Sequence, residues 1–101
     1  MLVTYQRNPM SRYRKKPVEI EAVKWDGGDY SHLEKFCGRN WNRASSVDEV
    51  GPPDEENVVV WNTMENQWLN VPLGHWIIRG LKGELYPCDP GVFAATYDPV
   101  T

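Results

Sequence analysis

The sequence predicts an α+β domain built on a small, strongly bent antiparallel sheet of about five strands, with one short helix and a C-terminal helical turn. Three observations predict it. Short β-branched and aromatic runs alternate with turn residues, one helical period follows a capping pattern, and two prolines end the last expected strand. Since the first strand can pair with the later hairpins, a partly open barrel is a second form that this arrangement allows.

Four of the expected strands lie in the second half of the chain. Runs of β-branched, aromatic or alternating residues place them at 58–62, 67–71, 76–78 and 84–86. The turns between them are expected at 64–66, at Pro72 to Gly74 and between Gly80 and Gly83. Pro87 and Pro90 lack the N–H that a ladder needs, so we expect strand pairing to end at Tyr86.

The first strand is expected over residues 18–25. Its apolar alternation changes phase between Ala22 and Val23, as it does across a β-bulge. A short helix should then begin at Ser31, because Ser31 and Glu34 form a capping-box pattern, and it should end at Gly38. The expected apolar side of this helix contains Tyr30, Leu33, Phe36 and Cys37.

Two further segments complete the expected fold. Residues 39–57 are rich in Asn, Ser, Pro, Gly and acids, which predicts a long loop with one helical turn near Val47. Residues 89–95 predict a helical turn that places Val92 and Phe93 on the core. Four of the five tryptophans are expected in the core, at Trp25, Trp61, Trp68 and Trp76.

Length and composition predict one domain. A chain of 101 residues with 41% hydrophobic side chains can bury one modest core, which we place in residues 18–101, after an extended basic arm at residues 1–17. Both faces of the strand at 58–62 are apolar, and a helix can cover only one of them. We therefore expect a homo-oligomer in which a second copy covers the other face.

The net charge of −3 does not favour binding to nucleic acid or to an anionic membrane. Basic residues crowd the start of the chain, at Arg7, Arg12, Arg14, Lys15 and Lys16, and acidic residues crowd 48–56. We interpret both as solvated surface. The alternative is that the basic arm docks on an acidic partner or on the acidic loop of a neighbouring copy.

The expected location is the cytoplasm. No apolar segment has the length of a membrane span or the pattern of a secretion signal. Two cysteines are too few for a disulfide framework, so both are expected as reduced thiols.

No catalytic constellation stands out, and we expect a protein that is not an enzyme and that uses no metal or cofactor. His32 and His75 are not at metal-ligand spacing to Cys37 or Cys88, and a zinc site would need all four to meet in space. We interpret Cys37 as a small core hydrophobe and Cys88 as a structural residue. An enzyme that uses Cys88 is the alternative, because basic side chains in the same hairpin would favour a thiolate.

The hairpin between Gly80 and Gly83 is the best candidate for a small anionic ligand. It presents two cations beside glycines with accessible backbone N–H groups, which suits a phosphate or a carboxylate. A neighbouring aromatic ring would stack on the base of a nucleotide. The candidate ligand-binding residues are Arg79, Lys82, Tyr86, His75 and Trp76. The alternative is a charged, solvated hairpin that protects a sheet edge.

Several motifs resemble, in order, those of a family of small bacteriophage and prophage proteins that is similar to the PGDYG-type domains. They lie at residues 10–25, 36–38, 76–90 and 92–97. The chain departs from the family at Pro72 to Trp76, where Leu73 is inserted and His75 stands in place of an Asp. The resemblance implies a phage origin, a location in the cytoplasm of the infected host cell, and an N-terminal extension at residues 1–9.

Three functional hypotheses follow from these observations. The first is a non-enzymatic phage accessory protein that binds and modulates a host factor. The second is a phage counter-defence protein that binds or sequesters a small nucleotide or other anion, and the third is the enzyme that uses Cys88.

Overall fold

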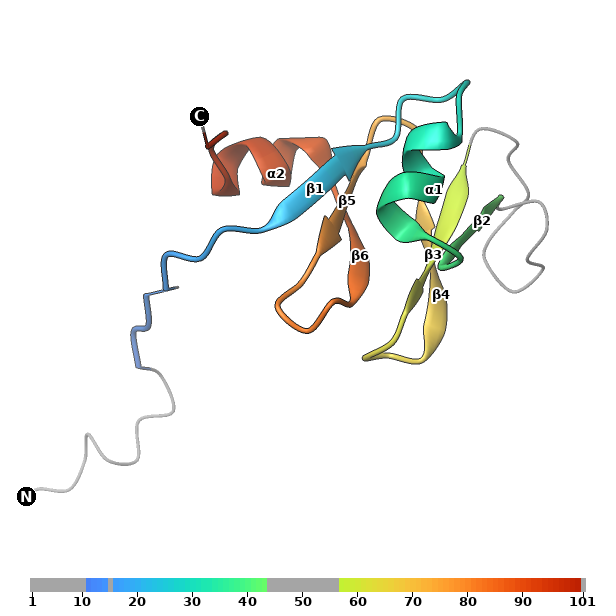
Figure 1. The fold of residues 1–101 in the computed structure, drawn as a ribbon. Coiled ribbons are helices and arrows are strands. Elements are labelled where there is room, and N and C mark those ends of the chain that lie inside the picture. Colours follow the sequence, from blue (N-terminus) through green and yellow to red (C-terminus); the bar gives the residue numbers. More distant parts are fainter. Residues whose placement is uncertain (1–10, 15, 44–56, 101) are drawn as a thin grey trace, which may run out of the picture.

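The computed structural model describes residues 11–14, 16–43 and 57–100. These residues form six strands and two helices (Figure 1), which confirms the α+β class with one strand more than expected. In chain order the elements are β1 (Glu21–Lys24), α1 (Ser31–Cys37), β2 (Trp41–Arg43), β3 (Val58–Asn62), β4 (Gln67–Val71), β5 (Trp76–Arg79), β6 (Leu85–Cys88) and α2 (Pro90–Thr96).

The strands form two antiparallel sheets of three strands each, in the orders β1-β5-β6 and β2-β3-β4. Pairing of β1 with β5 confirms that the first strand joins a later hairpin. The expected single bent sheet is wrong, and no closed barrel forms among the described strands. Strand β2 lies in the segment that was expected to be a loop. It pairs with β3, with Trp41 opposite Val60, and so adds a third strand to the β3-β4 hairpin.

The edge strand β6 explains why the two sheets stay separate. It packs against β3 and β4 without a ladder. Gly80 N donates to Glu84 O, and in an antiparallel pair every second residue is hydrogen-bonded to the partner strand. Leu85 and Pro87 are therefore at the positions whose backbone N and O atoms face away from β5. Pro87 has no N–H to offer there, and the Leu85 carbonyl accepts from Asn62 Nδ2 at 2.8 Å. A further strand therefore finds too few free groups for a ladder.

Strand pairing on β6 does not end at Tyr86 as expected, because Pro87 lies inside the strand, opposite Ile77. A proline is tolerated at this position since its nitrogen faces away from the only paired neighbour. The chain then enters α2 directly. Asp89 Oδ1 accepts from Gly91 N and Val92 N, and Pro90 occupies the first turn.

The bulge expected between Ala22 and Val23 is absent, and the bulge that does form lies elsewhere, on the partner strand opposite Trp25. The pairing of β1 with β5 is continuous from Glu21 to Lys24. Beyond it, Gly74 N donates to Trp25 O at 2.7 Å and Trp25 N donates to His75 O at 2.9 Å, so Trp25 opposes two residues. Gly74 has a φ of 86°, and His75 N donates to Pro72 O to close the turn. The bend expected from Pro72 and Gly74 is confirmed.

The start of α1 differs from the expected capping box. Tyr30 is the N-cap and makes no side-chain capping bond; Ser31 is already helical, and its backbone N–H donates to Asp29 Oδ1 at 2.8 Å. This hydrogen bond lowers the pKa of Asp29. Gly38 ends the helix as expected, with a φ of 63°.

The core lies between the two sheets and α1. It contains the side chains of Trp25, Leu33, Cys37, Val58, Val60, Val71, Ile77 and Leu85. On its α1 side, Trp25, Tyr30 and Trp41 form a continuous ring stack with centroid distances of 5.2 and 5.3 Å. This stack connects the end of β1, the start of α1 and β2.

Only one of the four tryptophans expected in the core is fully buried. Trp25 is buried, whereas Trp61, Trp68 and Trp76 are partly exposed. Val92 is also not on the core, since it is 56% exposed. The three tryptophans lie on outer faces because alternation along each strand sends every second residue away from the core. Val92 belongs to α2, in which no residue is buried.

Both apolar faces of β3 are buried within one chain. Val58, Val59 and Val60 have no exposed surface. The face that was expected to need a second copy is therefore already covered within one chain. The homo-oligomer remains a prediction, but the apolar faces of β3 no longer support it. The helical turn expected near Val47 and the acidic run at 48–56 lie outside the described residues.

We expect Asn62→Ala to lower the free energy of unfolding by about 2 kcal/mol, measured by urea unfolding. Asn62 is 3% exposed; its Nδ2 donates to Leu85 O, and its Oδ1 accepts from Glu65 N at 2.7 Å. Removal of the amide leaves these groups unpaired. Asn70→Ala in β4 is the matched control and should cost less than about 0.5 kcal/mol. Equal losses in the two variants would contradict this role of Asn62.

Candidate functional site

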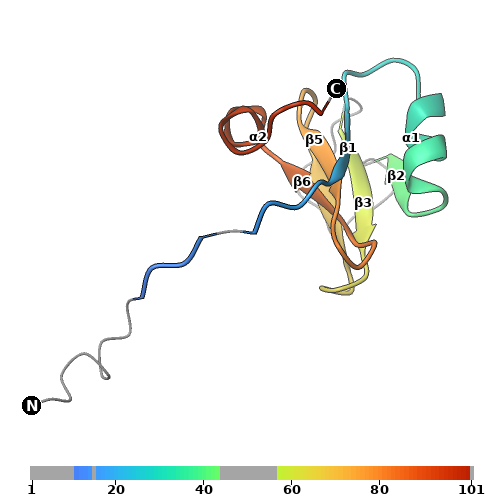
Figure 2. The same cartoon turned by 60° about the vertical axis from the view of Figure 1, so that its left-hand side comes forward.

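The five candidate ligand-binding residues do not meet at one site. Alternation along β5 places Trp76 on one face of its sheet and Arg79 on the other. The Trp76 ring stacks on Phe93 of α2, while Arg79 reaches α1, and the two helices lie on opposite sides of this sheet (Figure 2). Tyr86 lies opposite Ile78 and shares the α2 side with Trp76. His75 and Lys82 belong to the turns at the two ends of β5.

Arg79 is already engaged within the chain. Its Nη1 donates to Glu21 Oε1 and its Nη2 donates to the Phe36 carbonyl. The guanidinium carbon lies 4.2 Å from the centre of the Phe36 ring. These contacts connect β5, β1 and the last turn of α1, so the side chain serves the fold.

The hairpin after Arg79 binds a carboxylate of its own. Glu84 Oε1 accepts from Lys82 N at 3.0 Å, and the Glu84 carboxylate lies against Gly80, where an added Cβ would clash with it. Gly83 has a φ of 82°, and its N–H donates to Gly80 O. The backbone N–H groups of Lys82 and Gly83 are therefore already paired within the hairpin. The anion site remains a prediction, but these two N–H groups no longer support it.

The two cysteines differ in their surroundings. Burial raises the pKa of the Cys37 thiol to about 11, against a smaller opposing effect of Arg79, so this thiol stays protonated at neutral pH. Cys88 is half-buried, and its Sγ lies 3.6 Å from Asp89 O. His32 Nε2 contacts Lys24 O at 3.3 Å. Within 11–14, 16–43 and 57–100, no three His, Cys, Asp or Glu side chains gather as a metal site would require.

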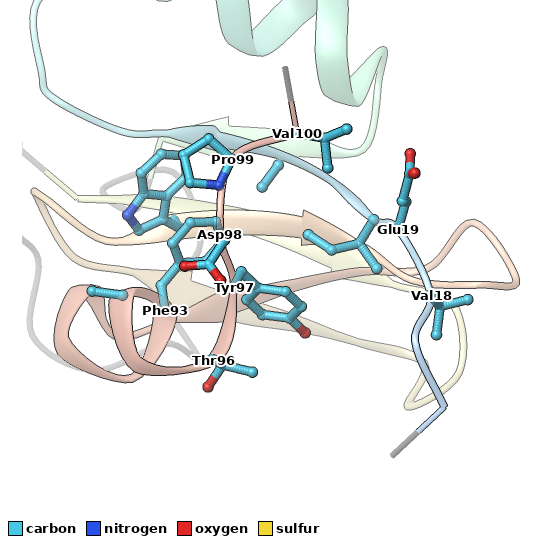
Figure 3. A pocket seen from close by; sticks show the side chains of 12 residues that line it. Val18, Glu19, Phe93, Thr96, Tyr97, Asp98, Pro99 and Val100 are labelled. Atoms are coloured by element: carbon cyan, nitrogen blue, oxygen red, sulfur yellow. The ribbon is translucent and has the colours of Figure 1, made fainter.

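A surface groove on the outer face of the β1-β5-β6 sheet is the best candidate for a binding site. We call it the α2 groove; it has a volume of about 760 Å³ (Figure 3). Its lining comes from residues 18–20 and Ala22, from Trp76 of β5, and from residues 93, 94 and 96–100. The groove thus joins both ends of the described chain, because β1 pairs with β5 and α2 follows β6.

Aromatic rings fix one wall of the α2 groove. Trp76 and Phe93 stack with a centroid distance of 4.0 Å and an interplanar angle of 7°, and the Phe93 and Tyr97 centroids are 5.1 Å apart. Burial, together with a hydrogen bond to Tyr97, raises the pKa of Tyr86 to about 12. Tyr86 is therefore neutral at physiological pH, and it holds Tyr97 against the sheet.

Much apolar surface around the α2 groove is open to solvent. No residue of α2 is buried. Val92 is 56% exposed, Val100 is 72% exposed, and Val18 also lies at the surface. These exposed apolar side chains make the α2 groove a candidate interaction surface.

Sequence reasoning selected part of the α2 groove, but for a different ligand chemistry. Trp76 lines the groove and Tyr86 contacts its wall, and both were expected beside an anion. Val18, Ile20 and Phe93 were missed, because they were assigned to the core-facing side of their elements. The available signal was that a short helix with apolar residues on several sides cannot bury all of them.

Comparison of the chain with protein-family models, with curated proteins and with solved structures finds no match. The phage family and the PGDYG-type resemblance therefore remain predictions. Neither described helix is long and apolar enough to cross a membrane.

We expect Arg79→Ala to lower the free energy of unfolding by about 1–2 kcal/mol, because it removes charge-assisted bonds that join α1 to the sheet. Lys82→Ala is the control and should cost less than about 0.5 kcal/mol. Thermal unfolding with and without pyrophosphate or ATP completes the experiment. A rise in Tm with ligand concentration in the wild type, lost in both variants, would support the anion site instead.

The raised pKa of Cys37 predicts a loss of stability in alkali. Above pH 9.0 the unfolded thiol ionises, whereas the folded thiol keeps its proton up to about pH 11. Stability should therefore fall through this window, by about 1.4 kcal/mol per pH unit for this group. Chemical unfolding at several pH values measures it, and Cys37→Ala should show a smaller slope. Identical slopes in the two proteins would refute the assignment.

Proposed function

We propose that this chain is a non-enzymatic bacteriophage accessory protein that binds and modulates a host protein through the α2 groove. The observation that carries the proposal is an apolar groove of about 760 Å³ with an aromatic wall, beside a helix that buries none of its residues. The phage origin rests on the resemblance of its motifs.

A protein segment suits the α2 groove better than a small molecule does. Small-molecule sites enclose most of the ligand surface, whereas here the lining residue Val100 is 72% exposed and a further exposed apolar side chain, Val92, lies on α2 outside the lining. An extended or helical segment of a partner can cover both the groove and this rim. Binding would bury the aromatic wall, which is the kind of surface that dominates interface energies.

Adjacent alanines in α2 provide a matched test. Ala94 lines the α2 groove and Ala95 does not, and both are exposed helical residues. Arginine at position 94 would place a bulky charge in the groove, whereas arginine at position 95 adds the same charge outside it. Immobilised wild type, Ala94→Arg and Ala95→Arg are therefore compared for the proteins that they retain from host lysate.

We expect wild type and Ala95→Arg to retain the same host protein and Ala94→Arg to lose at least nine-tenths of it, a change of about 1.4 kcal/mol or more. Circular dichroism of the three proteins controls for folding. Equal retention by the two variants, or retention by none of the three proteins, would contradict the proposal.

The other two hypotheses have less geometric support. Arg79 and the Lys82 backbone N–H are engaged within the chain, which leaves a nucleotide few of the expected contacts. Cys88 is half-buried beside the Asp89 carbonyl. Both remain predictions.

A further inference from the structure

The described part of the N-terminal arm carries a large aromatic side chain without cover. Residues 11–14, 16 and 17 lie in neither a helix nor a strand and are exposed. Tyr13 is 92% exposed, and arginines stand on both sides of it in the sequence. An aromatic ring between cations on an extended segment is typical of a binding element, because such rings bury much area at little cost in side-chain entropy.

The α2 groove complements this segment in apolar character and in charge. Its wall offers aromatic surface to a ring at Phe93 and Tyr97. Glu19 and Asp98 add carboxylates to its lining, and Figure 3 shows both beside the apolar side chains. A Tyr side chain fits the apolar part of such a groove, while the flanking arginines lie near the acids.

The arm cannot readily place Tyr13 in the groove of its own chain. The groove begins at Val18, so the backbone would have to reverse between Arg14 and Pro17. Pro17 restricts Lys16 to extended conformations, which opposes such a reversal. In Figures 1 and 2 the described part of the arm runs away from α2. Tyr13 can therefore reach an α2 groove more easily on a second copy of the chain than on its own copy.

We propose that the arm of one copy docks in the α2 groove of a second copy, with Tyr13 as its anchor. In this arrangement each copy supplies one arm and one groove to the other, and this reciprocal exchange closes a two-fold dimer. The inference shares the groove with the proposed function but does not require a host partner. A host segment would have to displace the arm, so dimerisation would regulate binding.

Sedimentation of the full chain over a concentration series, at low and high salt, tests this proposal. We expect a monomer–dimer equilibrium that weakens at least tenfold in Tyr13→Ala and in Ala94→Arg but is unchanged in Ala95→Arg. High salt should also weaken it, because the arginines and the acids attract one another. Tyr13→Phe should retain dimerisation, since the ring supplies most of the buried area.

Mixing the two defective variants provides a positive control. Tyr13→Ala keeps an intact groove, and Ala94→Arg keeps an intact arm, so the mixture regains one of the two contacts and should associate more than either variant alone. A wild type that is monomeric at every concentration, or a dimer unaffected by Tyr13→Ala, would overturn the inference. If host capture still depends on Ala94 in that case, the proposed function stands and only the arm exchange fails.

Discussion

The buried Asn62 side chain is the constraint on which the arrangement of the two sheets depends. The sheets share no ladder among the described strands, so their relative position needs another directional contact. Asn62 supplies it by donating from the end of β3 to Leu85 O at the start of β6 while accepting from Glu65 N. In a low-dielectric core such bonds are strong, and a shift of β6 would leave them unpaired. Apolar packing alone would allow the sheets to slide.

The α1 side of the β1-β5-β6 sheet is more firmly held than the α2 side. On the α1 side, Arg79 joins two strands to Phe36, and the ring stack of Trp25, Tyr30 and Trp41 links the strands to the helix. The α2 side is covered mainly by aromatic rings that stack at the surface. The difference leaves the core closed on one side and a groove open on the other.

Local signals in the sequence predicted the hairpins and the helix end. Gly38, Gly74 and Gly83 all adopt positive φ, and their turns lie where expected. Strand β2 was missed because two of its three residues are exposed and no alternation marks it. The bulge expected at Ala22 and Val23 is absent, because Ala22 lines the α2 groove and Val23 packs against the core, so that two apolar faces produce the change of phase without an extra residue.

The candidate site was harder to predict, because its contacts are long-range. Arg79 looked like a free cation, but its partner Glu21 lies 58 residues away in the sequence. The α2 groove exists only because strand pairing brings Val18 and Ile20 beside the C-terminal helix. Residue chemistry could select Trp76 as a candidate site residue, whereas the other residues of the groove could be found only from the topology.

The weak attachment of α2 also has a dynamic consequence. A helix of seven residues that buries no side chain adds little to the cooperative unit formed by the two sheets. Its backbone amides should exchange with solvent deuterium through local opening, well before those of β3 and β5. Occupation of the α2 groove would add contacts to α2 as well as to β1 and Trp76. Because α2 starts with the least protection, we expect the largest difference between bound and free molecules at residues 90–97. The helix that we expect to open first therefore also forms one side of the proposed binding groove.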